Sequence, residues 1–228
     1  MYPAVVAATV RAAVDTLYKS AAASGASGAS RANEEAAPAA PRGRGWLLYA
    51  VLSAVFAALT AIGAFLKIQI PVEGIPAITL QFFFTAMAGV LLGAKYGAIS
   101  QAVYVLLGLV GLPIFTMGGG FSYVLQPSFG FLVGLIPSAW VIGTLCKNAK
   151  SFWPMALGIL AGLAVLYLIG TPYMGLILNL YLGKGMSVWQ IVRAGCLLYL
   201  PGDVLKIVVC TALCLALRSR LPKALAAA

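Results

Sequence analysis

The sequence predicts an all-α membrane protein, built as a bundle of six transmembrane helices. Two observations predict this class: the composition is strongly apolar, and the apolar residues are grouped in long segments. Hydrophobic residues make up 62% of the chain and charged residues 9%, far below the roughly 25% charged residues of soluble domains. The mean hydropathy is +1.01.

Six apolar segments account for the predicted helices, and each is bounded by charged residues or by glycine and proline. They cover residues 46–66, 80–92, 96–112, 129–146, 152–180 and 199–217. The second segment is short for a span, and we expect it to begin inside the preceding loop. Residues 186–196 mix Trp189, Gln190 and Arg193 with aliphatic side chains, which predicts a short interfacial helix rather than a seventh span.

The basic residues predict the orientation of the bundle. With both termini in the cytoplasm, most loop lysines and arginines face the cytoplasm, which is the positive-inside pattern. The cytoplasmic set is Arg42, Arg44, Lys95, Lys147, Lys150, Arg218, Arg220 and Lys223. The smaller external set is Lys67, Lys184, Arg193 and Lys206. This arrangement explains the formal net charge of +10, and we expect no nucleic-acid partner.

Residues 1–45 predict a disordered N-terminal extension. Ala, Ser, Gly and Pro dominate residues 21–45, and such a composition does not bury enough apolar surface to fold. A weakly amphipathic helix over residues 4–18 leaves a transit peptide as one alternative, and a start codon assigned too early as another. The membrane domain is therefore predicted to cover residues 46–222.

Composition excludes several kinds of site. The chain has no histidine, which excludes zinc-protease helices, Ser/His/Asp triads and His-ligated metals. Its cysteines, at positions 146, 196, 210 and 214, form no CxxC pair, and no phosphate-binding G-x-x-x-x-G-K-[ST] sequence occurs. We therefore expect no enzyme activity, no metal and no cofactor. If transport consumes ATP, another chain must hydrolyse it.

Asp203 and Lys206 are the most informative residues of the chain. Asp203 is the only carboxylate after Glu73, and it lies in the last apolar segment. Ionisable residues within the bilayer are costly and are by default functional candidates. Residues three apart on a helix share a face, so one ligand could contact both side chains. A structural ion pair is the alternative interpretation.

Two loops on the predicted external side could cover a ligand. The prolines of segment 67–81 exclude continuous helix, while its isoleucine and valine residues keep it apolar, which predicts a lid ending at Gln81. The glycines of segment 118–127 permit close approach of the backbone to a ligand, with a flexible tight turn as the alternative. Together these features predict a ligand pocket covered by extracellular loops. Its candidate residues are Gln81, Gly119, Gly120, Phe121, Ser122, Tyr123, Gln126, Asp203 and Lys206.

A stripe of small residues marks the first segment. Ala50, Ala54 and Ala58 recur every four residues, and Ala57 and Ala61 repeat this spacing one position round the helix. Small residues let helices approach closely in lipid. We expect Ala50, Ala54 and Ala58 to face another protein, and packing within the bundle is the alternative.

Several motifs occur together, in a fixed order, over about residues 46–220. They are Ile62-Gly63-Ala64-Phe65-Leu66-Lys67-Ile68, the loop ending Thr79-Leu80-Gln81, Leu91-Leu92-Gly93, the run from Tyr104 to Phe115, the glycines 118–120, and Pro201-Gly202-Asp203-x-x-Lys206. In these motifs the chain resembles the BioY family, the biotin-specific S components of energy-coupling factor (ECF) transporters. One motif departs from the family pattern: Pro127-Ser128-Phe129-Gly130-Phe131 stands where Pro-Thr-Gly-Gly-Tyr is typical. Serine keeps a hydroxyl group, and Phe129 adds bulk beside the expected pocket.

The resemblance implies a high-affinity biotin-binding subunit of the bacterial cell (inner) membrane. Such a subunit mediates biotin uptake by docking on an ECF module of one transmembrane scaffold protein and two ABC-type ATPases, which alone use ATP. Asp203 would accept hydrogen bonds from the ureido N–H groups, and Lys206 would donate to the ureido carbonyl or the carboxylate. The alanine stripe would be the docking face. A solitary biotin transporter without an ATPase, or an S component for another small vitamin, remain alternatives.

Overall fold

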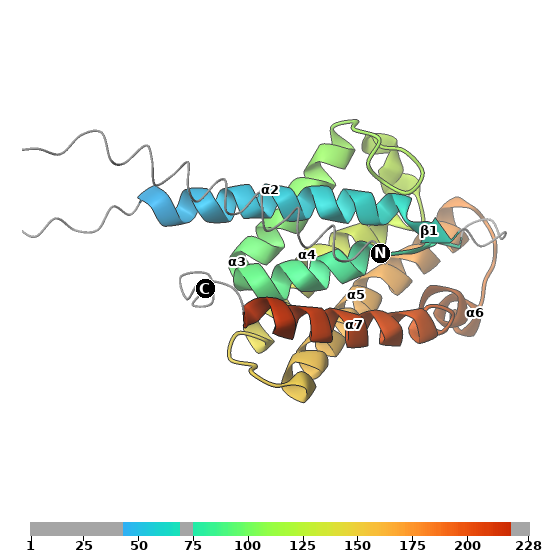
Figure 1. Cartoon of the computed structure of the whole chain (residues 1–228). Helices are drawn as coiled ribbons and strands as arrows, with labels where there is room; N and C mark the ends of the chain where they lie inside the picture. Colours follow the sequence, from blue (N-terminus) through green and yellow to red (C-terminus); the bar gives the residue numbers. More distant parts are fainter. Residues whose placement is uncertain (1–42, 69–74, 220–228) are drawn as a thin grey trace, which may run out of the picture. The chain divides into compact units, whose positions relative to one another are not determined.

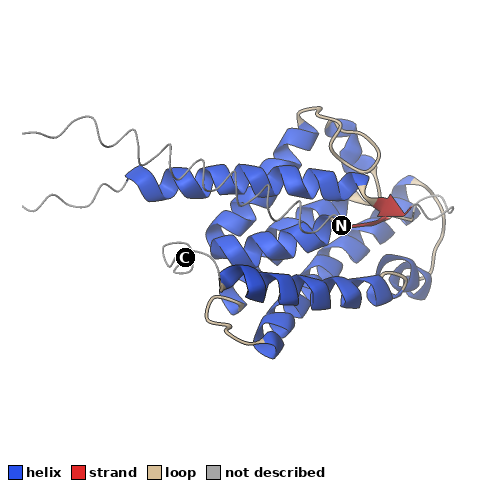
Figure 2. Ribbon diagram, viewed as in Figure 1, coloured by secondary structure: helices blue, strands red, loops and turns tan. Residues whose placement is uncertain are grey.

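The computed structural model describes residues 43–68 and 75–219, which form a mostly helical body (Figure 1 and Figure 2). Its helices are α2 (Gly43–Phe65), α3 (Gln81–Leu109), α4 (Phe129–Leu145), α5 (Phe152–Leu176), α6 (Val188–Val192) and α7 (Leu200–Arg218). Shorter elements are the 3-10 helix η1 (Phe121–Leu125), the π-helical turns η2 (Ile177–Tyr181) and η3 (Arg193–Leu197), and the strands β1 (Lys67–Ile68) and β2 (Ile78–Thr79). Helix α2 thus begins slightly before the predicted boundary at residue 46. The rest of the predicted N-terminal extension lies outside the described residues.

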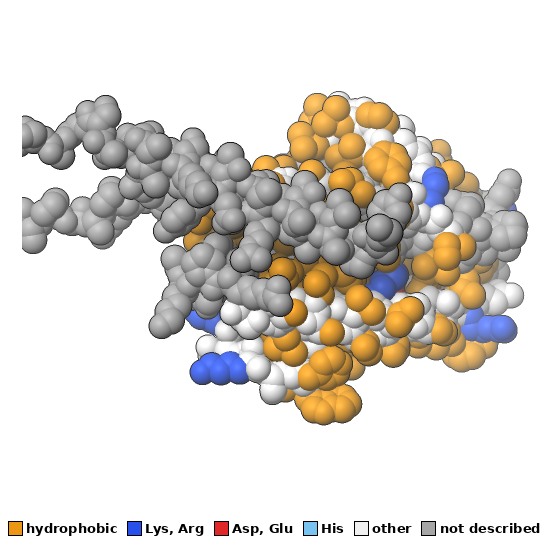
Figure 3. All heavy atoms as spheres, viewed as in Figure 1, with side chains coloured by type: hydrophobic (Ala, Val, Ile, Leu, Met, Phe, Trp, Pro, Cys, Tyr) orange, Lys and Arg blue, Asp and Glu red, His pale blue; other side chains and the backbone are white. Residues whose placement is uncertain are grey.

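The apolar segments predicted from the sequence are helical. Four stretches of the described chain are long and apolar enough to cross a membrane, and a shorter apolar helix, Phe129–Leu145, accompanies them. The four stretches are Trp46–Phe65, Gln81–Leu109, Phe152–Tyr181 and Val188–Arg218. Figure 3 shows hydrophobic side chains along the helices on one face, with lysine and arginine side chains mostly toward the two ends.

Helix α3 contains both the second and the third predicted segments, and it folds back on itself between them (Figure 1). The reversal occurs at Gly93, whose φ of 77° and ψ of 179° are rarely adopted by residues with side chains. Residues at similar separations on either side of Gly93 therefore meet: Gln81 Nε2 donates to Tyr104 OH at 2.6 Å, and Thr85 Oγ1 donates to Gln101 Oε1 at 2.9 Å. The two halves of α3 lie antiparallel.

The remaining helices pack around this reversed pair. Helix α2 packs against α3, α4 packs between α3 and α5, and α7 contacts α5 and α3. Glycine permits the closest approach: a Cβ atom added at Gly143 of α4 would lie 2.3 Å from the backbone nitrogen of Ala94. Ile142, which has no exposed surface, fills the space beside Gly162 of α5. Small residues thus set the spacing of these helices in the absence of any hydrophobic force between them in lipid.

Arg218 closes the end of the body at which α4 and α7 finish. Its Nη1 donates to the carbonyl oxygens of Cys146 at 2.8 Å and Ala149 at 3.1 Å, and its Nη2 donates to that of Val90 at 2.5 Å. Carbonyl groups at helix ends and in connections lack intrahelical donors, and one guanidinium supplies donors to three such carbonyl groups here. The neighbouring chain turns carry Lys95, Lys147 and Lys150, and this basic end agrees with the grouping of charges predicted from the sequence.

The opposite end carries the irregular segments. Strands β1 and β2 pair antiparallel, with Lys67 opposite Thr79, and the Lys67 ammonium donates to the carbonyl oxygen of Thr116. The connection after α3 returns onto its own helix through a bond from Gly120 N to Gly108 O at 2.7 Å. The helix expected within residues 186–196 is observed as α6 and η3, and α6 begins with a capping box between Ser187 and Gln190.

The packing at Gly143 predicts a specific loss of stability. Gly143→Ala should lower the free energy of unfolding by about 1–3 kcal/mol, because its Cβ would press against the backbone of Ala94. Thermal unfolding of the detergent-purified protein would measure the change. Gly202→Ala is the matched control, since nothing lies within 4 Å of a Cβ atom there. Equal melting temperatures for the two variants would contradict this account of the α3–α4 contact.

Candidate functional site

A cavity of about 80 Å³ lies at the end of the body that carries the β-hairpin formed by β1 and β2 and the glycine loop, residues 118–127. Its wall is formed by the segment around β2, the start of α3, the loop before α4, and helices α4, α5 and α7. Segments far apart in the sequence thus supply one site. Its polar residues other than Tyr199 belong to three hydrogen-bonded groups, and its remaining wall is largely apolar.

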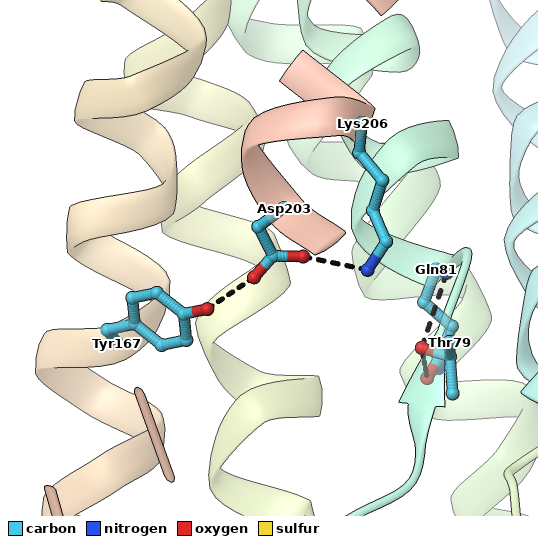
Figure 4. A network of polar contacts seen from close by, with 5 residues as sticks. All are labelled: Thr79, Gln81, Tyr167, Asp203 and Lys206. Carbon is cyan, nitrogen blue, oxygen red and sulfur yellow. Dashed lines mark hydrogen bonds and ion pairs between the residues drawn. The ribbon is translucent and has the colours of Figure 1, made fainter. Parts of the chain in front are cut away.

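The first group contains the charged pair. Lys206 Nζ donates to Asp203 Oδ1 at 2.7 Å, and the hydroxyl of Tyr167 on α5 donates to Asp203 Oδ2 (Figure 4). Asp203 lies in the first turn of α7, where a carboxylate interacts favourably with the helix dipole, and only 5% of its surface is exposed. Both carboxylate oxygens therefore have a donor in the protein, which reduces the penalty for burying the charge.

The second group lies on the side formed by β2 and α3 (Figure 4). Thr79 Oγ1 donates to Gln81 Oε1 at 3.0 Å, and Gln81 Nε2 donates to the buried hydroxyl of Tyr104 at 2.6 Å. The Tyr104 hydroxyl in turn donates to the carbonyl oxygen of Ile114 at 3.1 Å. This sequence of bonds fixes the amide of Gln81 and joins the two halves of α3 to the loop that follows them.

The third group surrounds Tyr123 of η1. Its hydroxyl lies 2.8 Å from Thr116 Oγ1 and accepts a hydrogen bond from Ser128 Oγ at 3.1 Å. Ser128 is the hydroxyl residue of the motif that departs from the family pattern, and it lines the cavity. Phe129 does not line it: its ring is buried against Tyr173, with 5.9 Å between the ring centroids. The expected extra bulk of Phe129 is therefore directed into the helix packing.

Apolar side chains and the segment before β2 complete the enclosure. Phe82, Phe131, Leu132, Leu135 and Leu166 contribute the apolar wall. Across it, the Tyr199 hydroxyl donates to the carbonyl oxygen of Pro76 at 2.5 Å and so connects the start of α7 to the covering segment. Part of the predicted lid, residues 69–74, lies outside the described residues.

The residues predicted for the site are divided by the structure. Gln81, Tyr123, Asp203 and Lys206 line the cavity together. Gly119, Ser122 and Gln126 line a separate hollow that borders the other side of Tyr123. Phe121 is 80% exposed, and Gly120 serves the loop turn, with a φ of 102°. A ligand-binding role for these residues remains a prediction.

Sequence reasoning missed several lining residues, above all Tyr167, Tyr199 and Thr79. Tyr167 and Tyr199 each place a hydroxyl group in an apolar segment, and this was the available signal. Within the described ranges, every buried side-chain nitrogen and oxygen has a hydrogen-bond partner. The polar groups of the cavity are therefore held in defined orientations by their own hydrogen bonds, beside an apolar wall.

The alanine stripe lies on the outside of the body. Ala50, Ala54 and Ala58 of α2 are exposed, whereas Ala57, on the neighbouring face, is 4% exposed and packs in the core. The first set therefore does not fill the interior of the bundle. Exposed small side chains of this kind let another helix approach closely.

Comparison with known proteins gives consistent results. The family model described as "BioY family" matches residues 39–223. The chain is 45% identical to the "Probable biotin transporter BioY" of Lysinibacillus sphaericus over 142 residues, which cover 61% of this chain and 71% of the relative. It is 36% identical to the "Biotin transporter BioY" of Thermotoga maritima over 170 residues, which cover 74% and 94% of the two chains.

A solved structure extends the comparison to the fold. It is the crystal structure of the S-component for biotin from an ECF-type ABC transporter, which matches with a TM-score of 0.68 and 27% sequence identity. The match covers 79% of this chain and 95% of that one. The relatives are membrane transporters, and the apolar helices of this chain agree with a multi-pass membrane protein. Because the family model matches most of the chain, from residue 39 to residue 223, this chain belongs to the BioY family.

Proposed function

We propose that this chain is the biotin-binding S component of an ECF transporter in the bacterial inner membrane. It captures biotin with high affinity from the external side and docks on an ECF module of one transmembrane scaffold protein and two ABC-type ATPases. The observation that carries the proposal is the buried Asp203–Lys206 pair, which faces an otherwise largely apolar cavity in a member of the BioY family.

Biotin suits this arrangement chemically. It carries a ureido group with two N–H donors and one carbonyl acceptor, an apolar thioether ring and chain, and a carboxylate. Asp203 accepts from the ureido N–H groups, and Lys206 donates to the ureido carbonyl or the carboxylate. Phe131 and the leucines of α4 contact the apolar part, as small-ligand pockets usually require.

The volume of the cavity is smaller than that of a typical small-ligand pocket. Its volume is about 80 Å³, whereas such pockets measure roughly 300–1,000 Å³. Binding therefore requires lining side chains, or the covering segment 75–79, to move outward. The hydrogen bond from Tyr199 to the Pro76 carbonyl lies where this movement would occur.

The proposed topology has six crossings with both termini in the cytoplasm. The two halves of α3 count separately, because the chain reverses at Gly93. The basic end near Arg218 then faces the cytoplasm, in agreement with the positive-inside rule. The cavity and the β-hairpin face outward, where vitamin is captured.

Single-cysteine labelling tests this orientation in a background without native cysteines. A cysteine at Lys147 should resist a membrane-impermeant thiol reagent in intact cells, because this exposed position lies at the basic end. Met117→Cys is the positive control, since Met117 is 66% exposed at the opposite end. Labelling at position 147 from outside would refute the orientation.

Calorimetric titration of the purified protein tests the ligand. Asp203→Asn and Lys206→Ala should each weaken biotin binding by about 1–3 kcal/mol, because each leaves a buried polar partner unsatisfied. Desthiobiotin, which keeps the ureido group, should compete with biotin. Val204→Ala is the control, as this neighbouring side chain is exposed and does not line the cavity.

If Asp203→Asn and Lys206→Ala both bind biotin with wild-type affinity but are expressed less, the pair has a structural role and does not bind the ligand. Absence of binding heat with biotin for the wild-type protein would favour an S component for another small vitamin.

Docking is tested on α2. Ala54→Leu combined with Ala58→Leu should leave biotin binding unchanged, because both positions are exposed, and should abolish co-purification with the ECF module and ATP-driven uptake. Ala57→Leu is the contrasting variant: it should destabilise the fold, since Ala57 is buried. Uptake that persists in cells without an ECF scaffold or ATPase would instead indicate a solitary transporter.

A further inference from the structure

We propose that Tyr167 is a positioning residue of the site: its hydroxyl holds the Asp203 carboxylate in the orientation that accepts a hydrogen bond from a ligand N–H group. The inference rests on the proposed function and adds a residue from a different helix to its specificity. Tyr167 lies on α5, and neither its position in the sequence nor its spacing from the charged pair marks it as a partner of α7.

The geometry around Asp203 requires a second donor to define the carboxylate plane. The terminal torsion of an aspartate is broad, and a lysine ammonium is a point charge on a flexible stem. With the Lys206 bond to Oδ1 alone, at 2.7 Å, the carboxylate of Asp203 could still rotate. The Tyr167 bond to Oδ2 removes this freedom, because it comes from a rigid ring on the opposite side of the carboxylate (Figure 4).

Tyr167 is itself held in place. Its ring meets that of Phe131 edge to face, with centroids 6.5 Å apart and an interplanar angle of 87°. Phe131 and Tyr167 both line the cavity, so the support is adjacent to the ligand space. Since each carboxylate oxygen has two acceptor positions, bonds from Lys206 and Tyr167 leave one position on each oxygen for a ligand.

A matched tyrosine separates this role from general support of α5. Tyr173 lies on the same helix, and its hydroxyl donates to the carbonyl oxygen of Val124 at 2.5 Å. Tyr173 does not line the cavity. Tyr173→Phe therefore removes an equivalent hydroxyl bond from α5 without touching Asp203, whereas Tyr167→Phe keeps the ring and removes only the bond to Oδ2.

The test compares biotin with two analogues, each methylated at one ureido nitrogen, in calorimetric titrations of the full-length protein. Wild type should discriminate against the analogue whose methylated nitrogen would face Asp203. Tyr167→Phe should weaken biotin binding by about tenfold, the loss of one charge-assisted hydrogen bond, and should weaken binding of that analogue less. The discrimination ratio should fall in Tyr167→Phe and stay at the wild-type value in Tyr173→Phe.

The double variant Asp203→Asn/Tyr167→Phe provides a second measurement. It is compared with Asp203→Asn, so the test does not rest on the single variant Tyr167→Phe. In the Asp203→Asn background, Tyr167→Phe should have no further effect on biotin affinity. A further loss there, or an equal loss for biotin and both analogues, would overturn the positioning role. If Asp203→Asn itself leaves the discrimination ratio unchanged, the assignment of Asp203 as the ureido acceptor fails instead, and the two failures are thereby distinguished.

Discussion

The burial of the Asp203–Lys206 ion pair is the constraint on which one end of this molecule depends. Charges removed from water destabilise the fold by several kcal/mol unless ion pairing and hydrogen bonds compensate for the lost hydration. Lys206 and Tyr167 satisfy the two oxygens of Asp203, and Tyr199, one turn before the aspartate, connects α7 to the segment that covers the cavity. The charged pair, the tyrosines and the covering segment therefore form one unit beside the apolar wall of α4 and α5.

The opposite end, near Arg218, depends on close helix packing and on hydrogen bonds to backbone carbonyl groups. Helices that are apolar on all sides gain little by association in lipid, so their packing depends on close contact and on satisfied backbone groups. The reversal of α3 at Gly93 and the contact of Gly143 with Ala94 bring backbones together. Arg218 then supplies donors to three carbonyl oxygens from two helix ends and a connection. This end is helical and basic, whereas the other end is irregular and carries the candidate site.

The division of the glycine loop between two hollows clarifies its role. Tyr123 lies between them: it lines the cavity that contains Asp203, and it borders the hollow lined by Ser122 and Gln126. Gly118 and Gly120 have positive φ angles, and the loop returns onto Gly108 near the end of α3. Their structural contribution is thus to deliver one buried tyrosine and its hydroxyl neighbours, Thr116 and Ser128, to the wall of the site.

Features that depend on neighbouring residues along the chain could be predicted from the sequence alone. Apolar length indicated the helices, the glycine and lysine after residue 92 marked the place where α3 reverses, and the spacing of Asp203 and Lys206 placed both on one helix face. The distant residues that contact them became known from the packing of the helices. Tyr167 reaches Asp203, and Tyr199 reaches Pro76, through the packing of separate elements, and an aromatic residue in an apolar segment has the same local pattern whether it faces lipid, core or ligand. Likewise, the alanine spacing indicated a contact surface, but only the packing of α2 against α3 decided that Ala57 is buried while Ala50, Ala54 and Ala58 face outward.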